Sequence, residues 1–146
     1  MKWVKQSIHY WCPDTKEHKF LGQNVTVAIL DTGISPHPDF KGRILSFRDF
    51  SSTTGSSEKV LFSFSHFSPL IDNSGHGTHV AGILAGSGLL SSGTYAGIAP
   101  FCNLIIGKVL DQNGNGSIKN VINGIQWIRD IYTQFHIRII NISRSE

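Results

Sequence analysis

Several features that mark other protein classes are rare or missing in this sequence. It has only two cysteines, Cys12 and Cys102, and each is isolated in the chain. They can form at most one disulfide, which is too little for the framework of a small secreted domain, and free thiols are typical of a reducing compartment. The first residues, MKWVKQSIHYW, lack the apolar core of a signal peptide. We therefore expect a cytoplasmic protein.

Long apolar runs and blocks of like charge are missing as well. No hydrophobic run reaches the roughly 20 residues that a membrane-spanning helix needs. Basic residues number 13 against 10 acidic ones, for a net charge of +3, and they are scattered along the chain. We therefore expect neither a membrane nor a nucleic acid as partner. The 146 residues, 40% hydrophobic and 16% charged, have the composition of one globular domain.

Strand and helix patterns alternate along the chain, which favours an α/β fold with a mainly parallel sheet. Short runs rich in apolar and β-branched residues predict strands at 25–30, 43–50, 103–110 and 137–143. Apolar residues at helical spacing predict one helix over 76–85 and another from an N-cap at Ser117 to Tyr132. In the first helix, Val80, Ala81, Ile83 and Leu84 are expected to pack against the sheet.

The remaining segments set the predicted domain limits. Residues 1–24 are mixed and polar and end in a turn signal, so we interpret them as an N-terminal extension before a domain over 25–146. Serines and aromatic residues dominate 51–71, which predicts a long surface excursion with room for a hairpin.

Two short motifs carry the chemistry of the sequence. Asp31 directly follows the first buried strand, and functional groups in open parallel sheets gather at the carboxyl ends of strands. His76 lies between Gly75 and Gly77 at the start of a helix. A catalytic imidazole needs one nitrogen facing substrate and the other held by a buried carboxylate. The pattern thus predicts an Asp31–His76 pair, with the glycines removing side chains that would block substrate or crowd the adjacent strand.

VAILDTGISPHPDF and DNSGHGTHVAGILAGSG resemble the aspartate and histidine motifs of the subtilisin-like serine proteases, the subtilase or peptidase S8 family, in that family's Asp-then-His order. The resemblance runs from residue 25 to about 143. It implies a three-layer α/β subtilisin-like fold and a serine endopeptidase that acts on extended peptides. It also implies that Asp31 orients the base, that His76 is the general base, and that His79 is structural, packed behind the site.

The same resemblance extends to the binding of a peptide substrate. YAGIAPFCNLIIGKVLDQNGNGS is similar to the family's segment that leads to the substrate-binding edge. There, the backbone around Gly114, Asn115 and Gly116 would pair with an extended peptide as an added strand. IINIS, with Ser143, resembles the opposing strand, which flanks the specificity pocket.

The sequence departs from the family pattern in what it lacks. The family's nucleophile stands in a GTS(M/A)A motif, and this sequence contains GTH and GTY but no such serine motif. The asparagine that stabilises the oxyanion in the family has no counterpart either, and RSE follows Ser143. We therefore expect a domain that is incomplete at its C-terminus, through a natural truncation, a frameshift or a deliberate cut, and that is inactive alone.

Other readings of the same residues compete with the protease. His76 and His79 lie at i, i+3 without the glutamate of helical zinc hydrolases, so we expect no metal there. DQNGNGSIKNVI, 111–122, begins like a calcium-binding loop but has Ile122 where the bidentate glutamate belongs. No cofactor is predicted, and calcium stays open.

A different functional class also stays open, namely a non-catalytic peptide-binding or interaction module derived from a protease. Self-association is a further expectation. Residues 137–143 form an apolar strand near the end of the chain, guarded only by Arg138 and Arg144, and an exposed edge of this kind pairs with other chains.

Overall fold

A computed structural model describes residues 2–10, 20–51, 58–60 and 72–143. Its centre is a five-stranded sheet in the order β3-β2-β4-β1-β5. The strands are β1 (Thr26–Asp31), β2 (Ile44–Asp49), β3 (Glu58–Val60), β4 (Asn103–Lys108) and β5 (Ile137–Ile142). Pairings among β2, β4, β1 and β5 are parallel, and the short β3 is antiparallel to β2. The predicted α/β class with a mainly parallel sheet is confirmed.

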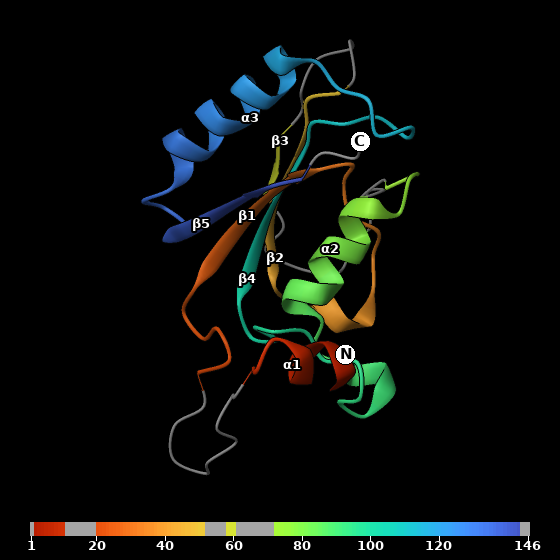
Figure 1. Ribbon diagram of the computed structural model, residues 1–146. Coiled ribbons are helices and arrows are strands. Elements are labelled where there is room, and N and C mark those ends of the chain that lie inside the picture. The colour runs from red at the N-terminus through yellow and green to blue at the C-terminus, as the bar shows by residue number, and fades with distance from the viewer. Residues whose placement is uncertain (1, 11–19, 52–57, 61–71, 144–146) are drawn as a thin grey trace.

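Helices cover both faces of the sheet and complete three layers (Figure 1). The two long helices are α2 (His76–Ala85) and α3 (Ile118–Ile131), and a short α1 (Lys2–Ser7) precedes the sheet. Two 3₁₀ turns, Pro38–Phe40 and Leu89–Ser91, lie in connecting segments. The hydroxyl of Tyr10 donates to the carbonyl of Ile98 at 2.7 Å, which attaches the segment after α1 to the domain.

Strand β1 is the structural centre because all six of its residues are buried. Successive side chains of a strand point to opposite faces, so a strand covered on both sides needs apolar residues throughout. Val27 and Ile29 belong to the core cluster on the α2 side, and Ala28 and Leu30 to the cluster on the α3 side. VAIL, residues 27–30, meets this requirement, which is why it forms the middle of the sheet.

The two helices contact the sheet with only part of the residues that their hydrophobic patterns predict, and in α2 the expected packing holds for Val80, Ala81 and Leu84. Helix α2 buries Gly77, Ala81 and Ala85, at i, i+4 and i+8, whereas Ile83 is 40% exposed. The prediction that Ile83 packs against the sheet was wrong, because small residues allow the closer approach. Helix α3 buries Gly124, Trp127, Ile128 and Ile131 and leaves Ile118, Ile122, Ile125 and Tyr132 exposed.

Several remaining predictions meet the structure only in part. Strand β3 lies in the segment 51–71 and forms a hairpin-like antiparallel pair with β2, but most of that segment lies outside the described residues. Cys102 is fully buried, and burial raises the pKa of its thiol; Cys12 lies outside the described residues. Among the described helices, none is both long and apolar enough to cross a membrane.

Candidate active site

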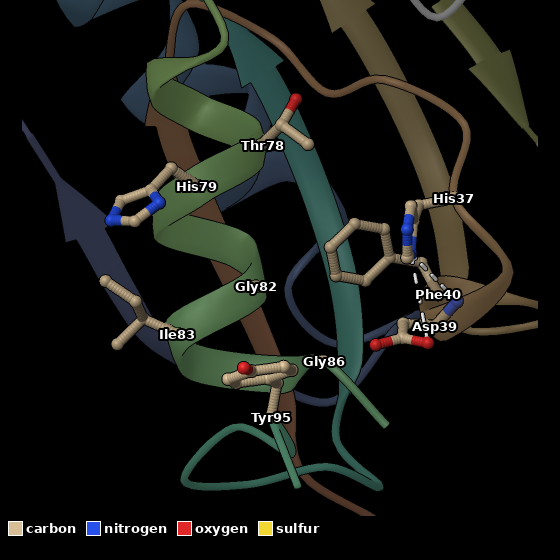
Figure 2. A pocket seen from close by; sticks show the side chains of 9 residues that line it. All are labelled: His37, Asp39, Phe40, Thr78, His79, Gly82, Ile83, Gly86 and Tyr95. Atoms are coloured by element: carbon tan, nitrogen blue, oxygen red, sulfur yellow. Dashed lines mark hydrogen bonds and ion pairs between the residues drawn. The ribbon is translucent and has the colours of Figure 1, made fainter. Parts of the chain in front are cut away.

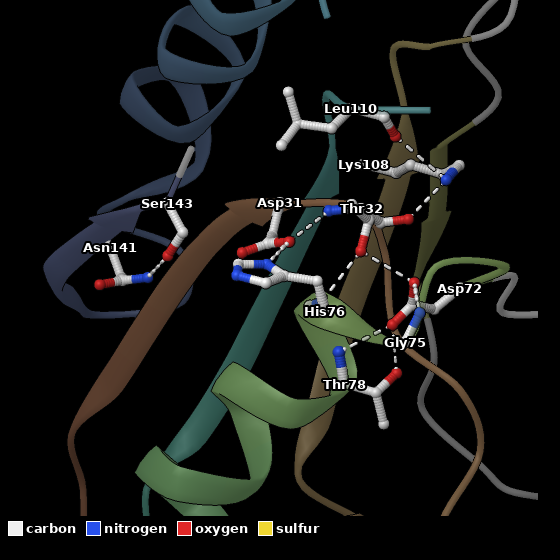
Figure 3. A network of polar contacts seen from close by, with 11 residues as sticks. Asp31, Thr32, Asp72, Gly75, His76, Thr78, Lys108, Leu110, Asn141 and Ser143 are labelled. Carbon is white, nitrogen blue, oxygen red and sulfur yellow. Dashed lines mark hydrogen bonds and ion pairs between the residues drawn. The ribbon is translucent and has the colours of Figure 1, made fainter. Parts of the chain in front are cut away.

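Asp31 is the last residue of β1, and its side chain is completely buried. Its Oδ1 accepts hydrogen bonds from the backbone N–H of Thr32 at 2.6 Å and from Nδ1 of His76 at 2.8 Å (Figure 3). The predicted contact between the two motif residues is therefore present. Because an ionised carboxylate only accepts hydrogen bonds, this geometry places the imidazole proton on Nδ1 and leaves Nε2 as a lone-pair acceptor.

His76 is the first residue of α2, and its side chain is 38% exposed while its partner Asp31 is buried. One edge of the ring is thus fixed from inside the protein and the other edge is accessible. A helix start gives the ring a rigid base close to the carboxyl end of β1. This arrangement suits a group that takes and returns protons at its open nitrogen.

The two positions beside His76 require glycine for different physical reasons. A Cβ on Gly77 would lie 2.3 Å from the carbonyl oxygen of Gly33, so α2 can approach the turn after β1 only without a side chain there. Gly75 has open space around it but a φ of 85°, a left-handed conformation that glycine adopts without strain. The expected crowding holds for Gly77, whereas Gly75 is needed for its backbone conformation.

Asp72 organises the approach to α2, and sequence reasoning did not single it out. Its Oδ1 accepts from the Thr32 hydroxyl and the Gly75 N–H, both at 2.8 Å, and its Oδ2 accepts from the Thr78 N–H at 2.8 Å and from the Thr78 hydroxyl. Burial alone would raise the pKa of the Asp72 carboxyl, but these hydrogen bonds outweigh burial and hold that pKa below its ordinary value of 3.8. An aspartate shortly before a helix is a capping signal, and it was available at the start of the motif.

The candidate peptide-binding turn follows β4. Asp111 closes it, since its carboxylate accepts from the N–H groups of Asn113 and Asn115 at 2.8 and 2.9 Å and its own N–H donates to the Asn115 carbonyl at 2.7 Å. Both backbone groups of Asn115 are therefore used inside the turn. Gly114 has a φ of 78°, and Gly116 is exposed. Pairing of a peptide with this segment stays a prediction.

Ser143 directly follows β5, the strand that pairs with β1 on the side opposite β4. Its N–H lies 3.4 Å from the carbonyl oxygen of Leu30, and its hydroxyl accepts from the Asn141 side-chain amide at 2.8 Å. The strand order β4-β1-β5 thus puts Ser143 and the turn after β4 on opposite flanks of Asp31, all at the carboxyl edge of the sheet (Figure 3).

His79 does not lie where the resemblance implied. It is exposed on the outer face of α2, where it lines a cavity of about 290 Å³, so its expected packing behind the site is wrong for this chain. Figure 2 shows His79 and His37 on different sides of this cavity. Asp39, also in its wall, accepts from the backbone N–H groups of Gly88 and Leu90 at 3.0 and 3.3 Å, which holds the loop after α2. Within the described residues, no three His, Cys, Asp or Glu side chains are grouped as metal ligands.

The chain thus combines a three-layer α/β fold with a buried aspartate at the end of β1 and its histidine partner at the start of α2. The model of the subtilase family matches residues 22–146, and the chain belongs to that family.

Its relatives are named as proteases. Serine protease AprX of Bacillus subtilis (strain 168) is 47% identical over 106 residues, which cover 73% of this chain and 21% of AprX. The major intracellular serine protease of the same organism is 41% identical, over 73% of this chain and 30% of its own length. Among solved structures, the CspB protease of Clostridium perfringens matches with a TM-score of 0.75 at 27% identity, over 92% of this chain and 31% of CspB. The chain thus spans between about a fifth and a third of these relatives' length.

Proposed function

We propose that this chain is the acid–base half of a subtilisin-like serine endopeptidase, with Asp31 and His76 as its catalytic residues. The observation that carries the proposal is the 2.8 Å contact between His76 Nδ1 and the fully buried Asp31 carboxylate, with the other edge of the imidazole open. In this role His76 removes a proton from an attacking hydroxyl through Nε2 and later returns it to the leaving amine. Asp31 holds the tautomer and stabilises the imidazolium that forms.

The 146 residues do not hydrolyse peptides by themselves under this proposal. Acyl transfer needs a hydroxyl nucleophile beside the base and donors aimed at the oxyanion, and the sequence has no GTS(M/A)A motif to supply the first. The purified chain is therefore expected to leave a fluorogenic peptide intact and to resist a serine-directed fluorophosphonate. Stoichiometric labelling that disappears in His76→Ala would contradict this and reveal a different nucleophile.

The substrate we propose is an extended peptide that lies across the carboxyl edge of the sheet. Gly114, Asn115 and Gly116 would contact it on the β4 side and Ser143 on the β5 side, the two flanks of Asp31. The cytoplasm is the compartment we propose; a relative at 41% identity is named as an intracellular protease, which supports it.

A chimera tests the proposal directly. The 106 residues of this chain that match AprX replace the matching segment of AprX, so that the remainder of AprX supplies a nucleophile. The chimera is expected to hydrolyse a peptide, to lose at least about 10⁴-fold in kcat on His76→Ala, and to keep its activity on His79→Ala, the matched histidine three residues away. A folded chimera without activity, or one indifferent to His76→Ala, contradicts the proposal. Peptide binding without turnover in such a chimera would favour the non-catalytic module.

A further inference from the structure

Lys108 is a buried cation that the proposed chemistry does not use. It is the last residue of β4, only 6% exposed, and the parallel register places it beside Asp31 of β1. Its Nζ donates to two backbone carbonyls, those of Thr32 at 2.5 Å and Leu110 at 3.1 Å (Figure 3). Within the described residues no carboxylate is paired with this ammonium. Burying an ammonium whose partners are carbonyl groups alone costs free energy. The role of these two carbonyl groups therefore needs explanation.

The first of these groups belongs to Thr32, in which every polar atom has a partner. Its N–H donates to Oδ1 of Asp31, the same oxygen that His76 Nδ1 contacts. Its hydroxyl donates to Asp72 and accepts from the Gly77 N–H at 2.9 Å. Lys108 fixes the remaining group, the carbonyl. A rotation of this residue would move a donor of the Asp31 carboxylate, so the bond from Lys108 bears on the Asp31–His76 geometry.

The second group is the carbonyl of Leu110, where the turn 111–116 begins. The N–H groups of Val109 and Leu110 donate to the Asp31 backbone carbonyl at 2.9 and 3.2 Å. Lys108 then binds the Leu110 carbonyl from its side chain. Leu110 is 5% exposed and Thr32 1%, so water cannot replace the ammonium at either carbonyl without opening the site.

We propose that Lys108 is a positioning residue that holds the Asp31–His76 pair and the candidate peptide-binding turn in one fixed relation. One ammonium joins the turn after β1 to the segment after β4. A peptide that binds the segment after β4 is therefore held in a fixed position relative to His76. This role rests on the proposed function and assigns a further residue to the same site.

Nuclear magnetic resonance of the whole chain tests this role without any catalytic turnover. A hydrogen-bonded imidazole Nδ1 proton gives a separate low-field signal, which reports the Asp31–His76 contact itself. Lys108→Met keeps an unbranched side chain that is one atom shorter and removes the donor. It is expected to abolish or broaden this signal and to shift the amide signals of Gly114 and Gly116. Lys119→Met, at an exposed lysine of α3, is the matched control and is expected to change neither. A folded Lys108→Met chain with an unchanged Nδ1 signal overturns the proposal.

A reciprocal measurement keeps the test decisive where Lys108→Met does not fold. The ¹⁵N signal of the Lys108 ammonium in the otherwise native chain is expected to shift on Asp31→Asn and to stay in place on Asp130→Asn, an exposed aspartate of α3. An ammonium signal that ignores Asp31→Asn overturns the proposal. The two proposals fail differently: an inactive, folded chimera contradicts the protease function, whereas an active chimera whose kcat is unchanged by Lys108→Met contradicts only the positioning role.

Discussion

Among the hydrogen bonds of the described residues, none joins Asp72 to Asp31 or His76, yet its two oxygens accept four hydrogen bonds around the turn that leads into α2. Asp72→Asn replaces one of these acceptors with a donor that faces other donors. We expect the variant to lose about 1–3 kcal/mol of unfolding free energy at pH 7, as measured by urea denaturation. Asp130→Asn is the control, since Asp130 is exposed and its partner among the described residues is its neighbour Arg129. It is expected to change stability by less than about 0.5 kcal/mol.

The lowered pKa of Asp72 also fixes the direction of a pH effect. Between the folded pKa and the ordinary value of 3.8, the unfolded chain binds more protons than the native one, so the native state loses stability as the pH falls through this range. The difference between the native chain and Asp72→Asn is therefore expected to be full above about pH 5 and to shrink below about pH 4. A difference that stays constant from pH 7 to pH 3 would show that the carboxylate charge has no part in it.

At the scale of residues, the sequence predicts what a local motif contains and misses what distant segments bring together. Asp31 and His76 could be identified because each stands in a distinctive run of neighbours. Lys108 could not, because its carbonyl partner in Thr32 is 76 positions away and meets it only when β4 lies beside β1. Asp111 stood out as the start of the run 111–122, but its closure of the turn through Asn115 appears only in the folded backbone.

At the scale of elements, substitution of the two glycines within helix α2 by alanine is expected to change stability in opposite directions. A methyl group on Gly77 meets the Gly33 carbonyl at 2.3 Å, whereas one on Gly82, in the same helix, meets nothing within 4 Å. Gly77→Ala is therefore expected to lose about 1–3 kcal/mol of stability, because α2 must move away from the turn after β1. Gly82→Ala is expected to gain about 0.5–1 kcal/mol from helix propensity alone.

Thermal and urea unfolding of both glycine variants measure this difference, and the Nδ1 signal of His76 reports its consequence for the site. The displacement in Gly77→Ala is expected to weaken that signal, since His76 is adjacent, while Gly82→Ala retains it. Equal stabilities for the two variants would mean that the helix is free to shift at its N-terminus, contrary to the close packing described here.

The sequence predicted where the strands and helices begin and end more accurately than which side of a helix is buried. The four predicted strands, β1, β2, β4 and β5, begin and end within a residue or two of their predicted limits, because buried runs flanked by turn residues leave little choice. The buried face of α2 was misjudged at Ile83 because Val80, Ala81, Ile83 and Leu84 make the helix apolar on several sides. Periodicity alone cannot choose among such sides; the sheet selects the one whose small residues allow the closest contact.

At the scale of the whole molecule, β5 presents an apolar strand at the end of the sheet. Within the described sheet it pairs only with β1, and Ile139, Ile140 and Ile142 are 54%, 43% and 51% exposed. The backbone groups and apolar side chains of such an edge favour pairing with another chain. We therefore expect the isolated chain to self-associate through residues 137–143 as its concentration rises.

Ile140→Lys tests this expectation, because the exposed position accepts a lysine in the monomer but places a charge in any interface formed at the edge. Its dissociation constant, measured by sedimentation velocity, is expected to rise by about tenfold or more, which corresponds to about 1.4 kcal/mol or more. Ile83→Lys changes a similarly exposed isoleucine on α2, away from the edge, and is expected to leave the association unchanged. A native chain that stays monomeric at high concentration and unfolds in one cooperative thermal transition would contradict this expectation. It would show that the β5 edge does not drive association, because an exposed apolar edge strand would otherwise pair with a second copy.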